Sequence, residues 1–256
     1  MILHPRPPGL AAISQSAHAL LAFQLADHWG NRETPRPAPR AEVLAAVLLH
    51  DAGWDDAEDP PRLAPDGRPL AFDTFPGEER EALWTASIRT ARARSRYAAY
   101  LVSHHVSLLA SDYARQPHPG VLAREQARRE RLRAELEREP AYSQLLETGA
   151  DAVNRAVLRL CDGLAVHLAR GADGRSELPG LHRRDGEVPI ELRAVGERVY
   201  RLDPWPLIGR RLTVSAEARL LPSDRFPDET TLRAAWNAAP TVRLAWRLLA
   251  PGTRAD

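Results

Sequence analysis

Apolar residues recur at helical spacing through the first two thirds of the chain. In the first such stretch, Ile13, Ala17, Leu21, Leu25 and Trp29 share one face, because residues four apart lie one above another on a helix. Similar patterns predict further helices over residues 41–51, 78–93, 95–111, 121–139 and 150–169. The sequence therefore predicts a helical core.

The pattern changes in the last third. Short alternating segments bounded by Gly, Pro and Asp are typical of strands, and they cover residues 188–194, 198–202, 211–221 and 242–248. A short helix is expected over residues 229–237. We therefore predict a mainly α fold, in which a helical domain over 1–175 carries a small β-rich C-terminal subdomain of α+β type over 176–256, packed on it.

Composition excludes several classes of protein. The formal net charge of the 256 residues is +1, which gives no reason to expect binding to a nucleic acid duplex or an anionic membrane. Cys161 is the only cysteine, so neither an intramolecular disulfide nor a zinc site made of thiolates is possible. We find no signal-peptide core and no apolar run of about 18 residues. We therefore expect a cytoplasmic protein with a small-molecule substrate and no membrane partner, and homodimer formation stays open.

Histidines and carboxylates lie on the apolar faces of four predicted helices. His18 lies in the first apolar stripe, His50 and Asp51 end the second helix, and His105 and Asp162 lie inside later apolar helices. A single such histidine is usually a core residue with satisfied hydrogen bonds, but a buried carboxylate is costly unless a cation or strong donors balance it. Four helices that each contribute such a group predict a metal site.

The residue types at this site limit the metal. Imidazole and carboxylate ligands suit Fe, Mn, Co, Ni or Zn and make calcium a poor match, and one or two ions are compatible with the residues. His104 lies at the margin of the site. Trp54, Asp55 and Asp56 follow the His-Asp pair and either line the pocket, orient the ligands or cap a loop. Four arginines either bind a substrate phosphate or form a solvated surface: Arg89, Arg92, Arg94 and Arg96.

The order of these residues resembles a known superfamily. His18, the His50-Asp51 pair, the His104-His105 pair and Asp162 follow one another as in the HD superfamily of metal-dependent phosphohydrolases. The stretches SQSAHALLAFQLADHWG, LLHDAGWDD, GRPLAF, YAAYLVSHH, CDGLAVHL and DPWPLIG are similar to a bacterial HD-like family of unknown function. This similarity covers most of the chain, including the β-rich part.

The resemblance implies an HD-type helical core and a role for each site residue. It makes His18, His50, Asp51 and Asp162 ligands of a divalent transition metal, with Asp51 also catalytic and able to bridge two ions. His105 is implied as a further ligand and catalytic group, and it would contribute to a second site where two ions bind; the full set of histidines of such a site is only partly present. The expected reaction is hydrolysis of a phosphate ester of a small molecule or nucleotide.

Two alternative functions use the same residues. Some HD-fold proteins hold two irons and activate dioxygen to oxidise a small molecule, and this reaction would consume oxygen. The other alternative is a non-catalytic domain that senses a nucleotide or a metal. The intact His50-Asp51 pair argues against the sensor, because degenerate HD modules tend to lose it.

Overall fold

The computed structural model describes residues 1–112, 118–171 and 173–254. Its helices are α1 (Gln15–Asp27), α2 (Arg40–Leu49), α3 (Asp55–Glu58), α4 (Gly77–Arg92), α5 (Arg96–Asp112), α6 (Pro119–Leu136), α7 (Pro140–Glu147), α8 (Asp151–Arg170) and α9 (Glu229–Ala238). Its strands are β1 (Ile2–Arg6), β2 (Gly9–Ile13), β3 (Arg175–Arg183), β4 (Gly186–Gly196), β5 (Val199–Asp203), β6 (Arg211–Leu221) and β7 (Thr241–Leu249).

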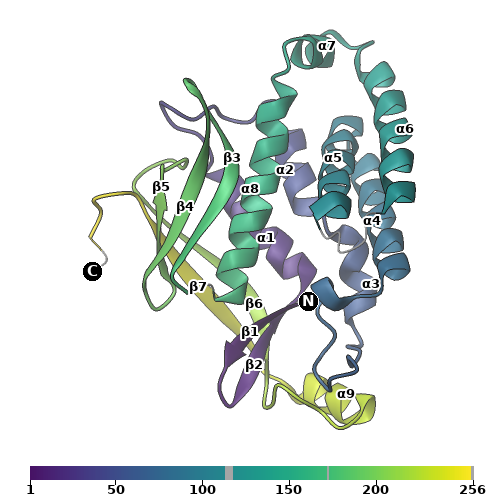
Figure 1. The fold of residues 1–256 in the computed structure, drawn as a ribbon, viewed down its shortest axis with the longest axis vertical. Coiled ribbons are helices and arrows are strands. Elements are labelled where there is room, and N and C mark those ends of the chain that lie inside the picture. Colours follow the sequence, from purple (N-terminus) through teal and green to yellow (C-terminus); the bar gives the residue numbers. More distant parts are fainter. Residues whose placement is uncertain (113–117, 172, 255–256) are drawn as a thin grey trace.

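Within the described residues, the strands form one seven-stranded sheet in the order β1-β2-β6-β7-β5-β4-β3. Neighbouring strands are antiparallel except β5 and β7, which are parallel. Figure 1 shows the curled sheet on one side of the molecule and most of the helices on the other. Helices α1 and α8 lie between them, with α1 against β6 and α8 against β1 and β3.

The prediction of a mainly α fold, with an HD-type helical core and a small β-rich C-terminal subdomain, is wrong. Of the described residues, 49% are helical and 24% are in strands, and the large sheet also takes in the N-terminal hairpin β1–β2. Strands from both ends of the chain pair directly, since Ala12 of β2 is in register with Arg219 of β6. The fold is therefore α+β, with one sheet that spans both halves of the sequence.

Local signals explain where the elements near the site begin and end. The side chain of Ser14 accepts a hydrogen bond from the Ala17 N–H and caps the start of α1, as serine does at helix N-termini. Gly171 ends α8 in a left-handed conformation with φ of 70°, which glycine adopts without steric penalty. These caps set the first and last turns of the two helices that face the sheet.

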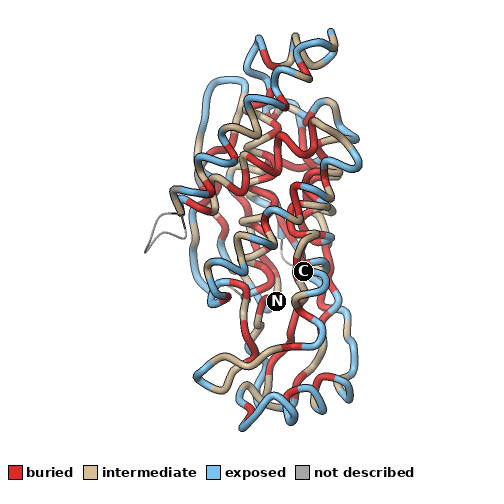
Figure 2. Tube along the Cα trace, turned by 90° about the vertical axis from the view of Figure 1, so that its right-hand side faces the viewer, coloured by how far each residue is buried: buried red, intermediate tan, exposed pale blue. Residues whose placement is uncertain are grey.

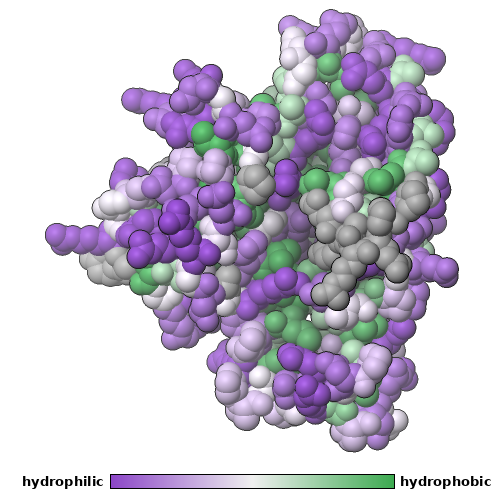
Figure 3. All heavy atoms as spheres, in the orientation of Figure 1, coloured by the Kyte–Doolittle hydropathy of each residue, from purple (hydrophilic) through white to green (hydrophobic). Residues whose placement is uncertain are grey.

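The main core lies between the sheet and the helices. Leu25 and Trp29 near the end of α1, Leu101 on α5, Leu164 on α8 and Trp246 on β7 are all almost completely buried. Figure 2 shows buried segments running through the interior of both layers, and Figure 3 shows hydrophilic side chains over most of one outer face. Among the described residues, no helix combines the length and apolar character that crossing a membrane requires.

A glutamine side chain completes one edge of β6. Strand β2 pairs with β6 only over Arg219–Leu221, and beyond that point α1 runs beside the strand. The Gln24 amide of α1 donates to the Ser215 carbonyl at 2.8 Å and accepts from the Ser215 N–H at 3.0 Å. The Gln24 side chain thus takes the place of a neighbouring strand for the N–H and the carbonyl of Ser215, which would otherwise lack a hydrogen-bond partner.

We predict that Gln24→Leu lowers the free energy of unfolding by about 1–3 kcal/mol, because a buried N–H and a buried carbonyl lose their partner. Ser215 is 8% exposed, so water replaces the amide poorly. Denaturant unfolding measures the change, and Gln126→Leu on the exposed face of α6 is the control, with an expected change within about 0.5 kcal/mol. Equal stability of the two variants would show that the Gln24–Ser215 hydrogen bonds contribute little to the free energy of unfolding.

Candidate metal centre

Four helices bring the predicted site residues together in the interior. His18 lies on the buried face of α1, His50 caps the end of α2 with Asp51 after it, His105 lies on α5 and Asp162 on α8. These helices pack against one another in pairs: α1 with α2 and α8, and α5 with α2 and α8. The buried stripes predicted from the sequence therefore point into one shared volume.

The polar atoms of this centre lie close together. His18 Nε2 is 2.9 Å from Asp162 Oδ1, and His50 Nε2 is 3.4 Å from the same oxygen. Asp51 Oδ2 lies 3.2 Å from His50 Nε2 and 4.0 Å from His18 Nε2. His105 Nε2 faces the other oxygen of Asp162, Oδ2, at 3.3 Å. The tightest group is His18, His50 and Asp162, whose ligand atoms all lie within 4.8 Å of one another.

The hydrogen bonding of the histidines fits a metal ion. His50 Nδ1 lies 2.7 Å from the Val47 carbonyl, so it carries the proton and leaves the Nε2 lone pair directed at the centre. Among the described residues, His50 Nε2 and both ring nitrogens of His105 are buried without a hydrogen-bond partner. Buried polar atoms are rarely left in this state, and a cation is the group that would satisfy lone pairs and carboxylates together.

Electrostatics keeps the two carboxylates of the centre in a metal-binding form. Burial raises the pKa of Asp162, but His105, His18 and His50 lower it by more, so that it lies well below the ordinary range. Burial likewise raises the pKa of Asp51, and His50 is the main group that lowers it to a net decrease. Both carboxylates are therefore ionised at neutral pH, as metal ligands must be.

One neighbour of the centre was not predicted from the sequence. Gln15, in the first turn of α1, donates from Nε2 to Asp51 Oδ2 at 3.0 Å. A hydrogen bond of this kind fixes the orientation of a ligating carboxylate. Its sequence signal is its position three residues before His18, which puts both side chains on one face of the helix.

A small cavity of about 30 Å³ borders the centre, which is room for about one water molecule. Trp54 lines it together with Phe72, Arg80 and Trp84, and the Arg80 guanidinium lies over the Trp84 ring at 5.6 Å. Trp54 was predicted as a possible lining residue, but Arg80 was not, because the sequence of its helix is typical of a charged surface.

The structure does not bring the other candidates to the centre. Asp55 and Asp56 are exposed, and Asp55 accepts a hydrogen bond from the Ser16 hydroxyl. Three of the four arginines named above are exposed, and two of the four pair with glutamates on the outside: Arg92 with Glu135, and Arg96 with Glu139. A surface role suits these side chains better than contact with a substrate at the centre.

His104 lies beside the centre and outside it. Its ring packs edge-on against Tyr100, with ring centroids 4.6 Å apart. Burial, with Arg155 and Arg129 nearby, lowers the pKa of His104 to about 3, so the ring is neutral at physiological pH. The adjacent histidines of α5 thus face different surroundings, with His105 toward Asp162 and His104 toward the outer part of the helix bundle.

Comparison with known proteins gives a family and no activity. Neither the curated proteins nor the solved structures contain a significant match to the chain. A family model described as "Protein of unknown function (DUF3891)" matches residues 1–223, which confirms the expected membership of a family of unknown function. The match shows no link to the HD superfamily. With helices α1 to α8, strands β1 to β6 and all five central residues inside the matched region, the chain belongs to the DUF3891 family.

Proposed function

We propose that the protein is a metal-dependent hydrolase that cleaves a phosphate ester of a small molecule or nucleotide. The observation that carries this proposal is the convergence of three imidazoles and two carboxylates from four helices, with buried lone pairs directed at one another. His18, His50, Asp51 and Asp162 would hold a divalent transition metal such as Fe, Mn, Co, Ni or Zn. The chain order of these residues resembles HD phosphohydrolases, and we include that relationship in the proposal.

The residues of the centre suit hydrolysis of a phosphate ester. A bound divalent ion supplies Lewis-acid polarisation of a phosphoryl oxygen and a lowered pKa for water. Asp51, held by Gln15, accepts the proton of the attacking water while a new P–O bond forms. His105 stands outside the tightest ligand group and delivers a proton to the leaving oxygen as the ester P–O bond breaks. Water is the only co-reactant, so the atoms balance without an oxidant.

The test is metal analysis followed by activity assays on reloaded protein. Purified protein is stripped with a chelator, reloaded separately with Fe(II), Mn, Co, Ni or Zn, and assayed with nitrophenyl phosphate esters and a panel of nucleotides. We expect turnover that requires one of these metals and is abolished by Asp51→Asn. Protein that binds metal but releases no phosphate from any compound of the panel would contradict the hydrolase.

One observation favours the oxygenase as a second candidate. The two oxygens of Asp162 face different histidines, Oδ1 toward His18 and Oδ2 toward His105, as in a carboxylate that bridges two ions. Iron at two per chain together with oxygen consumption would support this candidate. One ion per chain together with phosphate release would support the hydrolase.

We predict that His105→Ala lowers kcat by at least about 100-fold, the usual effect of losing a general acid or base. His104→Ala is the matched control, because its ring faces away from Asp162, and we expect a change of less than about tenfold. Metal content is measured in parallel: a hydrolase with one ion keeps it in both variants, whereas a two-ion centre loses part of it in His105→Ala. Similar activities of the two variants would refute the role of His105.

A further inference from the structure

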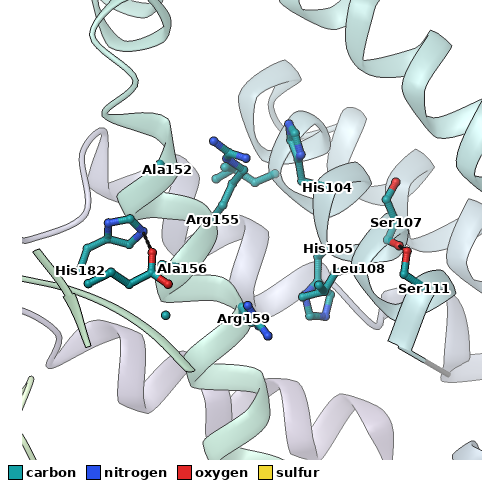
Figure 4. Close-up of a pocket in the computed structure, with 13 residues that line it drawn as sticks. His104, His105, Ser107, Leu108, Ser111, Ala152, Arg155, Ala156, Arg159 and His182 are labelled. Atoms are coloured by element: carbon teal, nitrogen blue, oxygen red, sulfur yellow. Dashed lines mark hydrogen bonds and ion pairs between the residues drawn. The ribbon is translucent and has the colours of Figure 1, made fainter. Parts of the chain in front are cut away.

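A groove with a volume of about 500 Å³ opens between α5, α8 and the β3–β4 hairpin. Figure 4 shows its polar side chains: His104 and His105 come from α5, Arg155 and Arg159 from α8, and His182 from β3. This volume lies within the range of sites for small molecules. The groove is much larger than the cavity beside Trp54, and the hydrolase mechanism does not use its arginines.

The groove shares a lining residue with the metal centre. His105 lines both the groove and the small cavity at the centre. On α8, Arg155, Arg159 and Asp162 follow one another at spacings of four and three residues, so they share one face of the helix. At a rise of 1.5 Å per residue, Arg159 lies roughly 5 Å and Arg155 roughly 10 Å from Asp162 along the helix axis. The two arginines thus form a path that ends at the centre.

The inner part of this groove has an excess of positive charge. Arg155 is paired with Asp151 Oδ2 at 3.1 Å. Among the described residues, Arg159 has no hydrogen-bond or ion-pair partner, and its side chain extends toward His105 in Figure 4. The acidic side chain that lines the groove, Glu187, is 57% exposed and lies 3.4 Å from His182. Arg159 therefore keeps its charge and its donors for a ligand.

We propose that this groove binds the far, anionic end of the substrate. The substrate is then a phosphate ester that carries a second anionic group, a carboxylate or a phosphate, about 5–10 Å from the ester that is cleaved. Arg159 donates a bidentate, charge-assisted pair of hydrogen bonds to that group, and Arg155 binds the side of the group that lies farther from the metal centre. This inference rests on the proposed function, and it adds the substrate class and two binding residues.

A pair of substrates that differ in one charge tests the proposal. The phosphate ester of ω-hydroxyhexanoate carries a terminal carboxylate, and its methyl ester lacks that charge. We expect the wild type to prefer the carboxylate by at least about tenfold in kcat/KM, as a charge-assisted hydrogen bond implies. In Arg155→Gln/Arg159→Gln the preference disappears, through a higher KM for the carboxylate.

Two further variants control for changes in folding and in general charge. Arg159→Gln alone keeps the Arg155–Asp151 pair and should still lose most of the preference. Arg131→Gln removes an exposed charge from α6, and this variant should retain the preference for the carboxylate. A wild type that turns over both compounds equally, or a double variant that keeps the preference, would overturn the proposal.

A binding measurement separates this proposal from the hydrolase itself. Tripolyphosphate is titrated calorimetrically into the metal-loaded full chain. If no ester is hydrolysed, yet tripolyphosphate binds at least about tenfold more weakly to the double variant than to the wild type and Arg131→Gln, the hydrolase is refuted and the groove stands as an anion site. Equal binding to all three proteins would refute the groove, whatever the activity.

Discussion

Asp162→Ala is expected to reduce metal affinity by more than about 100-fold, because even residues that only orient metal ligands cost 10–100-fold when they are removed. The two carboxylate oxygens of Asp162 lie 2.9–3.4 Å from His18, His50 and His105. Without Asp162 the three imidazoles lose the anion that they share. Elemental analysis of purified protein, calibrated by a titration with Mn or Zn, measures the effect.

Asp27→Ala is the matched control for this variant. Asp27 lies at the end of α1, one of the four helices of the centre, but its side chain is 44% exposed and pairs with Arg40 at 2.5 Å, so we expect unchanged metal content. Circular dichroism confirms that both variants fold. A folded Asp162→Ala protein that keeps its full metal content would show that the assigned centre is not where the ion binds.

Removal of the metal is expected to lower the melting temperature of the wild type by about 10 °C. An ion present at about 1,000 times its Kd stabilises the folded state by about 4 kcal/mol, and each kcal/mol shifts Tm by about 2–4 °C in a domain of this size. The effect arises because the ligands converge from four helices that separate on unfolding. Differential scanning calorimetry with and without chelator measures the shift.

The same chelator added to Asp162→Ala should leave its Tm unchanged, because that protein binds no ion. A shift of equal size in the variant would mean that the chelator acts elsewhere. No shift in a wild type of proven metal content would mean that the ion binds outside the helical interior.

The helices and the central residues could be predicted from sequence because their signals are local. An apolar stripe at helical spacing identifies α1 from its own residues, and it also places His18 on the buried side. The same reasoning applies to Asp162, whose helix has the clearest separation of polar and apolar faces. Five residues placed in this way on four helices lie together in the structure, and their role as ligands stays a prediction.

The sheet was underestimated because its pairings are not local. Strands β1 and β2 have five residues each, and the Pro7-Pro8 pair between them suggests a loop. Strand β3 contains Pro179 and Gly180, which usually argue against a strand, and its register with β4 shifts between Leu178 and Leu181. Each strand is stabilised by partners distant in sequence, and one sequence does not reveal which partners these are.

Side chains that support the centre were missed for a related reason. Gln15, Arg80 and Arg159 belong to residue types that are common on helix surfaces, so their identity carries no signal of burial. Gln15 contacts Asp51, Arg80 lies over Trp84, and Arg159 lines the same groove as His105. These positions follow from how the helices pack. Helical spacing from a known site residue is the one sequence signal that selects Gln15 and Arg159.

The pairing of β2 with β6 also has a consequence for biosynthesis. The ribosome releases the β1–β2 hairpin long before it makes Arg219, the residue with which Ala12 is in register. Until then, the open edge of β2 and the apolar side of α1 have no partner from the sheet. Contacts so distant in sequence slow folding and prolong exposure of aggregation-prone strand edges. The nascent chain is therefore a natural client for chaperones that shield such surfaces during synthesis.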